Sequence, residues 1–143
     1  MIHDLLSLEA YFAQFVGQFG IAHYIFGGLD EIVMRESKGI RYPSFCCELF
    51  EERLDDEGKS VFSLRLSVEK KAGKQPRSED RKTVNDLRHI LRQVLEKMYG
   101  DSPNTLVFYR RSAKFYYKEH RTGDDNLMAL VEIDITGVTP CED

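Results

Sequence analysis

The sequence of 143 residues predicts an α+β fold: a mainly antiparallel sheet of two hairpins, with an N-terminal helix and one long helix (about 78–99) packed on one face. Two observations support this prediction. Two segments repeat apolar residues at helical spacing, and two pairs of segments alternate apolar and polar residues as half-buried strands do. Neither a shift in composition nor a long linker divides the chain, so we expect residues 1–143 to form a single domain.

The first helix is predicted to begin near Asp4 and to end at Gly20. Its apolar stripe recurs at intervals of three and four residues and comprises Leu5, Leu8, Phe12, Phe15 and Phe19. The helix carries no lysine or arginine, so its polar face is thin and we expect it to lie largely against other parts of the molecule. Residues 21–40 show no clear periodicity and are interrupted by Gly27 and Gly28, and Leu29, Ile32 and Val33 are compatible with either a short helical turn or a strand.

The first hairpin is predicted to pair Ser44–Leu54 with Ser60–Lys71 through a turn at residues 55–59. Tyr42 precedes Pro43 and is therefore biased toward extended backbone. In the second strand one face is apolar, with Phe62, Leu64, Leu66 and Val68, and the other face is polar. The sequence thus indicates a sheet with one face in contact with solvent.

The long helix is the clearest element of the sequence. Ser78 is the predicted N-cap, Gly100 the predicted stop, and the apolar stripe comprises Val84, Leu87, Leu91, Val94 and Met98. Alternating residues then predict a second hairpin that pairs Thr105–Lys118 with Leu127–Thr136. We expect the faces bearing Phe62 and Val131 to pack on the helix side that carries Leu87 and Leu91.

Three cysteines, Cys46, Cys47 and Cys141, are an odd number, and no disulfide framework is expected. Cys46 and Cys47 are adjacent in a predicted strand, so their side chains point to opposite faces. We expect one thiol in the core and one on the surface. The four histidines are scattered and show no zinc-ligand spacing, so no metal site is predicted from them.

Composition restricts the possible function classes. The net charge of −4 and a hydrophobic content of 42% describe an ordinary globular chain, and no run is apolar enough to span a membrane. The first basic residue is Arg35, so no secretory signal is expected and a cytoplasmic protein is predicted. No nucleophile, phosphate-binding or cofactor motif stands out, and we expect neither catalytic residues nor a cofactor.

Charge is segregated along the chain. Fifteen basic and seven acidic residues lie between Arg65 and Arg121, whereas the remainder holds five basic and 17 acidic residues. The pI near 5.6 argues against nucleic acid as the partner. The segregated charges are also compatible with a contact between copies of the chain, or with a solvated surface that has no partner. The residues predicted for a contact between copies are Glu51, Glu52, Asp55 and Asp56 on one side, and Lys70, Lys71, Lys74 and Arg77 on the other.

Three further functions remain open. Glu69, followed by Lys71 and preceded by Asp56, has the spacing of a metal-dependent nuclease of restriction-endonuclease-like type, in which carboxylates hold Mg²⁺. The aromatic and basic residues of 109–118 are also compatible with base stacking, although such a strand more often faces the core on one side and solvent on the other. An adaptor domain for one host protein is a third alternative.

The order of elements resembles that of phage tail-terminator and tail-completion proteins. The matching stretches are 42–45 entering a strand, 61–69 as its partner, 84–98 as the covering helix and 127–136 as the last strand. The resemblance implies a non-enzymatic structural protein that forms a ring, commonly hexameric, and ends tail polymerisation. It implies as partners the chain itself and other tail proteins, and as location the host cytoplasm or the virion.

Overall fold

The computed structural model describes residues 1–27, 39, 41–119 and 125–138. Its elements, in chain order, are α1 (Leu5–Phe15), the 3-10 turn η1 (Val16–Phe19), β1 (His23–Gly27), β2 (Ser44–Leu54), β3 (Ser60–Lys71), the 3-10 turn η2 (Arg77–Glu79), α3 (Asp80–Asp101), β4 (Leu106–Phe108), the 3-10 turn η3 (Arg110–Ser112), β5 (Lys114–Lys118) and β6 (Asn126–Gly137). The predicted α+β class is confirmed.

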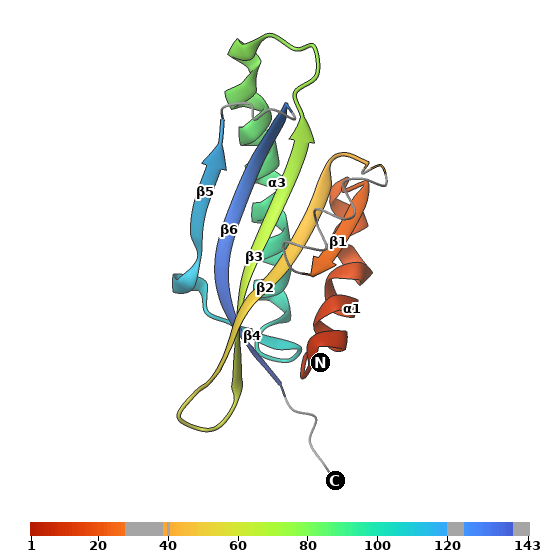
Figure 1. The fold of residues 1–143 in the computed structure, drawn as a ribbon. Helices are drawn as coiled ribbons and strands as arrows, with labels where there is room; N and C mark the ends of the chain where they lie inside the picture. The colour runs from red at the N-terminus through yellow and green to blue at the C-terminus, as the bar shows by residue number, and fades with distance from the viewer. Residues whose placement is uncertain (28–38, 40, 120–124, 139–143) are drawn as a thin grey trace.

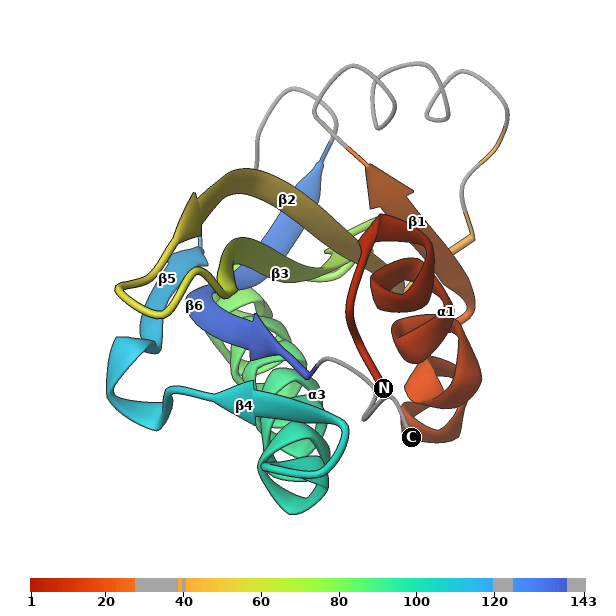
Figure 2. The ribbon, with the colours of Figure 1, turned by 90° about the horizontal axis from the view of Figure 1, so that it is seen from below.

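One mixed sheet organises the molecule, in the strand order β1-β2-β3-β6-β4, with β5 also paired to β6. β1 runs parallel to β2, and every other pairing is antiparallel. α1 and α3 both lie on the same side of this sheet, so the described helices cover one face (Figure 2). The predicted arrangement of helices on a single face is therefore correct.

The first hairpin has the predicted bounds, because alternation and turn chemistry agree there. The Asp55 carboxylate accepts the backbone N–H groups of Glu57 and Lys59, each at 2.9 Å, and this closes the turn. A register shift lies between Leu49 and Glu51 in β2. Beyond this shift the hairpin extends past the ends of both helices (Figure 1).

α1 begins where the sequence predicts, with Asp4 as its N-cap. The Asp4 carboxylate accepts the Ser7 N–H at 2.7 Å, and the Ser7 hydroxyl in turn accepts the Asp4 N–H at 3.0 Å. Gly20, at φ 78°, ends the helical segment as predicted. The assignment of Leu5 to the buried stripe is wrong: Leu5 is 50% exposed, and Ile2 and Tyr11 are buried instead.

α3 differs from the prediction at both ends. Ser78 is not its N-cap but lies in η2, and Pro76 and the 3-10 turn lead into a helix that starts at Asp80. Asp80 is buried and accepts a hydrogen bond from the Gln75 amide at 2.9 Å. Gly100 does not stop the helix, which continues to Asp101. Within the described residues, no helix has both the length and the apolar composition needed to cross a membrane.

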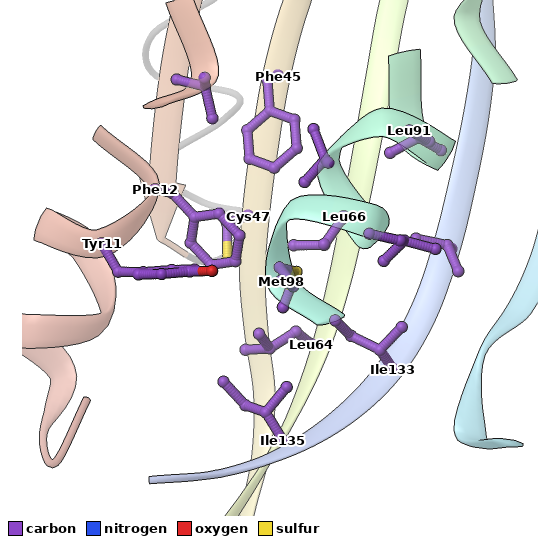
Figure 3. Packing of buried hydrophobic residues seen from close by; sticks show 14 of the residues in the cluster. Tyr11, Phe12, Phe45, Cys47, Leu64, Leu66, Leu91, Met98, Ile133 and Ile135 are labelled. Atoms are coloured by element: carbon purple, nitrogen blue, oxygen red, sulfur yellow. The ribbon is translucent and has the colours of Figure 1, made fainter. Parts of the chain in front are cut away.

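The core lies between the helices and the covered face of the sheet (Figure 3). Leu64 and Leu66 of β3 are fully buried opposite Leu91 and Met98 of α3, as the sequence predicts. Phe12 of α1 meets Phe45 of β2 with ring centroids 5.6 Å apart, so α1 packs mainly on the β2 side. At about 25 cal/mol per Å² of apolar surface, this burial is the main stabilising contribution.

The second hairpin is more complex than predicted. Thr105–Lys118 is not one strand: β4 and β5 pair with different parts of β6, and η3 separates them. The Ser112 hydroxyl accepts the Asp134 N–H at 2.9 Å, so a side chain replaces a strand partner at the interruption. β1 was not predicted, and residues 28–38 and 40 of the unassigned segment lie outside the described residues.

Both described cysteines are buried, which corrects the expectation of one surface thiol. Cys47 is 0% exposed in the core, and Cys46, on the other face, is 9% exposed. Cys46 is paired in register with Ile25 of β1, which is also buried. The predicted opposite orientation is right, and the strand beside Cys46, β1, is one that the sequence did not reveal. Cys141 lies outside the described residues.

Candidate interaction surface

The acidic and basic residues predicted for a contact between copies lie at opposite ends of the β2–β3 hairpin. Figure 1 shows the turn of residues 55–59 at the bottom of the molecule and the loop after β3 at the top. Glu51 is paired with Ser63 of β3, and Lys70 lies seven residues further along that strand. At roughly 3.3 Å per residue, the two groups are therefore at least roughly 23 Å apart. The structure therefore does not bring the two groups together within one copy.

The acidic end is the hairpin turn with the adjoining part of β2. Residues 51–57 contain five carboxylates and one arginine. Glu51, Glu52 and Asp56 are exposed, while Asp55 is partly buried because its carboxylate holds the turn. Asp55 is therefore a structural residue, and of the four acidic residues predicted for the contact the three exposed ones, Glu51, Glu52 and Asp56, are available to a partner.

The single arginine of this end points away from the turn carboxylates. Arg53 donates to the Ser63 hydroxyl at 3.1 Å and to Asp134 Oδ2 at 3.2 Å, across two strands. Asp134 also accepts the Ser63 hydroxyl, at 2.7 Å. The positive charge of Arg53 is thus engaged on the face of the sheet opposite the helices, and the tip keeps a net negative charge.

The basic end comprises the end of β3, the loop after it and the start of α3. Residues 70–82 contain six basic and two acidic residues. Lys70, Lys71, Lys74 and Arg77 are all exposed, and the Lys71 ammonium lies 5.8 Å from the centre of the Tyr42 ring. Asp80, one of the two acidic residues, is buried and so contributes little to the surface.

The face of the sheet opposite the helices carries a second set of charges, which the sequence did not single out. Arg65 of β3 lies between Glu48 of β2, at 3.6 Å, and Glu132 of β6, at 3.4 Å. Its guanidinium also stacks over the Phe50 ring, 4.1 Å from the ring centre. These contacts hold Arg65 in place, so it belongs to the architecture of the sheet and not to a mobile basic patch.

The residues of the alternative nuclease site are not adjacent. Asp56 lies in the hairpin turn, whereas Glu69 and Lys71 lie near the far end of β3, paired with Met128 and Asn126 of β6. Glu69 accepts a hydrogen bond from the Asn126 amide at 3.1 Å. In the described parts of the chain, no three His, Cys, Asp or Glu side chains gather as metal ligands would. One metal ion cannot bridge Asp56 and Glu69 at this separation.

The aromatic and basic strand is partly occupied by contacts within the chain. Phe115 packs against the core, and its ring is stacked with that of Tyr117 at 6.5 Å. Arg88 of α3 lies over the Phe115 ring and donates to the Tyr117 hydroxyl at 3.2 Å. Tyr116, which points to the other face, is 49% exposed. This alternation agrees with a strand that faces the core on one side.

Comparison of the chain with models of protein families and with the sequences of curated proteins finds no match in either case.

Proposed function

We propose that this chain is a non-enzymatic structural protein of a phage or prophage tail, of the tail-terminator type, that assembles as a ring-shaped homo-oligomer. In this assembly the acidic hairpin end of one copy contacts the basic end of the next. The observation that carries the proposal is the placement of exposed, opposite charges at the two ends of one hairpin.

Such a placement favours a head-to-tail contact. Because the two ends differ in charge, each copy offers one acidic end and one basic end. A heterologous contact of this kind closes into a ring when the rotation between neighbouring copies permits. Complementary potentials also orient the approaching copies and disfavour wrong pairings. The order of helix, hairpin, long helix and final strands supports the resemblance to tail-terminator proteins.

The solution mass tests the assembly. At high protein concentration and low salt, light scattering coupled to gel filtration is expected to give a multiple of the 16.6 kDa chain mass. The variant K74E/R77E is expected to dissociate, because it places carboxylates opposite the acidic end of the neighbouring copy. R111E/K114E changes the charge by the same amount at two exposed positions outside both ends and serves as the matched control.

A charge exchange sharpens the test. E52K/D56K alone is expected to dissociate as K74E/R77E does, and an equimolar mixture of the two variants is expected to reassemble, since each tip then meets an end of opposite charge. A monodisperse wild-type monomer at low salt would contradict the proposal. For the role in the tail, loss of the protein from its phage is expected to give tails of uncontrolled length under the electron microscope.

A further inference from the structure

A shallow groove lies between α3 and the segment from β4 to β5. Its volume is about 210 Å³, below the roughly 300–1,000 Å³ of typical small-molecule sites. The floor is apolar: Leu95 and Phe108 are each 7% exposed, and Ala113 and Phe115 are half-buried. A groove of this size and lining suits one or two apolar side chains of a protein partner.

The rim of the groove is positively charged. Arg110 and Arg92 approach the same Glu96 carboxylate, at 3.6 Å and 4.0 Å respectively. The Arg110 guanidinium also stacks over the Tyr99 ring, 4.7 Å from its centre. Two guanidinium groups share one carboxylate, so the rim can accept a further carboxylate from outside.

The first turns of α1 carry a protruding surface of the opposite kind. Leu6 is 77% exposed and Leu5 is 50% exposed, although both are large apolar residues. Glu9, also exposed, lies three and four residues further along and therefore on the same helix surface. α1 contains no basic residue. Adjacent exposed leucines of this kind indicate a contact surface.

The two surfaces cannot meet within one copy. Figure 2 shows α1 on the side of the sheet near β1, whereas η3 and β5 lie on the opposite side. Each surface is complementary to the other in apolar character and charge: exposed leucines beside a carboxylate on α1, and an apolar floor beside two arginines in the groove. A second copy of the chain therefore carries a fitting occupant for the groove of the first.

We propose that the start of α1 of one copy docks in this groove of a neighbouring copy, with Leu6 on the apolar floor and Glu9 toward the two arginines. The inference rests on the self-assembly proposed above. It uses residues outside the two charged ends, so the two contacts can be tested separately.

Disulfide cross-linking tests the contact directly. L6C and A113C are prepared separately in a Cys141→Ser background, mixed under conditions in which the wild type assembles, and oxidised. We expect disulfide-linked dimers that contain one chain of each variant. Q14C, at an exposed residue of α1 outside the surface formed by Leu5, Leu6 and Glu9, serves as the matched control with A113C. An L6C yield no higher than that of Q14C would overturn the docking.

Surface variants distinguish this contact from the charged-end contact. L5S/L6S and R110E are each expected to raise the apparent dissociation constant about tenfold or more, whereas Q14S, at an exposed position of α1 outside both contacts, leaves it unchanged. If K74E/R77E dissociates the assembly while L5S/L6S and R110E do not, the groove contact is wrong and the charged-end contact stands. The reverse pattern supports the groove and removes the charged ends. A wild-type monomer overturns both.

Discussion

The Tyr11 hydroxyl of α1 donates a hydrogen bond of 2.7 Å to Oδ2 of Asp101, in the last turn of α3. The other oxygen of this carboxylate accepts the Lys97 ammonium at 3.0 Å. One carboxylate therefore joins the two helices that cover the sheet, at the end where the hairpin extends beyond them.

Removal of this hydroxyl is the first prediction. Tyr11→Phe is expected to lower the free energy of unfolding by about 1–2 kcal/mol, since a partly buried hydrogen bond to a charged group is lost. Urea denaturation measures the change, and Tyr116→Phe, at a 49% exposed ring, is the control. An equal effect of both variants would mean that the bond to Asp101 contributes nothing.

The same bond predicts an alkaline dependence. Burial and the bond to Asp101 raise the pKa of Tyr11 in the folded state. Because the pKa is raised on folding, the stability that Tyr11 contributes is complete below the pKa of tyrosine in the unfolded chain, near 10. This stability is lost as the pH rises above that value. The stability difference between wild type and Tyr11→Phe should therefore shrink above about pH 10.

Asp4 predicts the opposite dependence. Hydrogen bonds from the backbone and side chain of Ser7 lower the pKa of Asp4 below its usual 3.8. A lowered pKa gives stability that is present above the unfolded value and is lost as pH falls through the folded value. Asp4→Ala should therefore have a lower melting temperature at pH 7, and the difference should shrink at pH 3. A constant difference would contradict the capping role.

Gly137 predicts a backbone collision. A Cβ at this position would lie 2.6 Å from the Ile2 carbonyl oxygen, which also accepts the Val138 N–H. Gly137→Ala is therefore expected to cost roughly 1–3 kcal/mol. Gly100→Ala is the matched control, since its Cβ meets nothing within 4 Å and it lies in α3. The control should gain about 0.5–1 kcal/mol in urea denaturation.

The buried thiol predicts low reactivity. Burial raises the pKa of Cys47 well above its ordinary value, so little thiolate forms at neutral pH. Iodoacetamide should leave Cys47 unmodified in the folded protein and modify it in urea, as peptide mass spectrometry detects. L54C, added as an exposed reference, should react rapidly under both conditions. Equal rates at the two positions would show that the β2 strand opens readily.

The sequence predicts helices and strands well where local signals agree. It fails where the bounds of an element depend on contacts with residues far away in the sequence. β2 and β3 were located because alternation and the Asp55 turn coincide. β1 was missed because it has five residues and its parallel pairing with β2 crosses a segment without periodicity. The interruption at η3 was missed because Ser112 bonds to Asp134, 22 residues away.

The candidate surfaces follow the same division. The charged ends were recognised because each is nearly continuous in sequence, around residues 51–57 and 70–82. The groove was not recognised, because its lining comes from α3 and from residues 108–115, which only the fold brings together. Leu5 was assigned to the core because helical spacing alone does not show which side of α1 faces the sheet.

The position of β6 bears on how the chain reaches its native state during synthesis. β6 pairs with β3, β4 and β5, and its partners in β3 lie more than 50 residues earlier in the chain. While β6 is still inside the ribosome, β3 of the nascent chain is paired with β2 alone, and its other edge is open. Such an edge can pair with another chain, and β3 is therefore protected from misassembly only after β6 has emerged and paired with it.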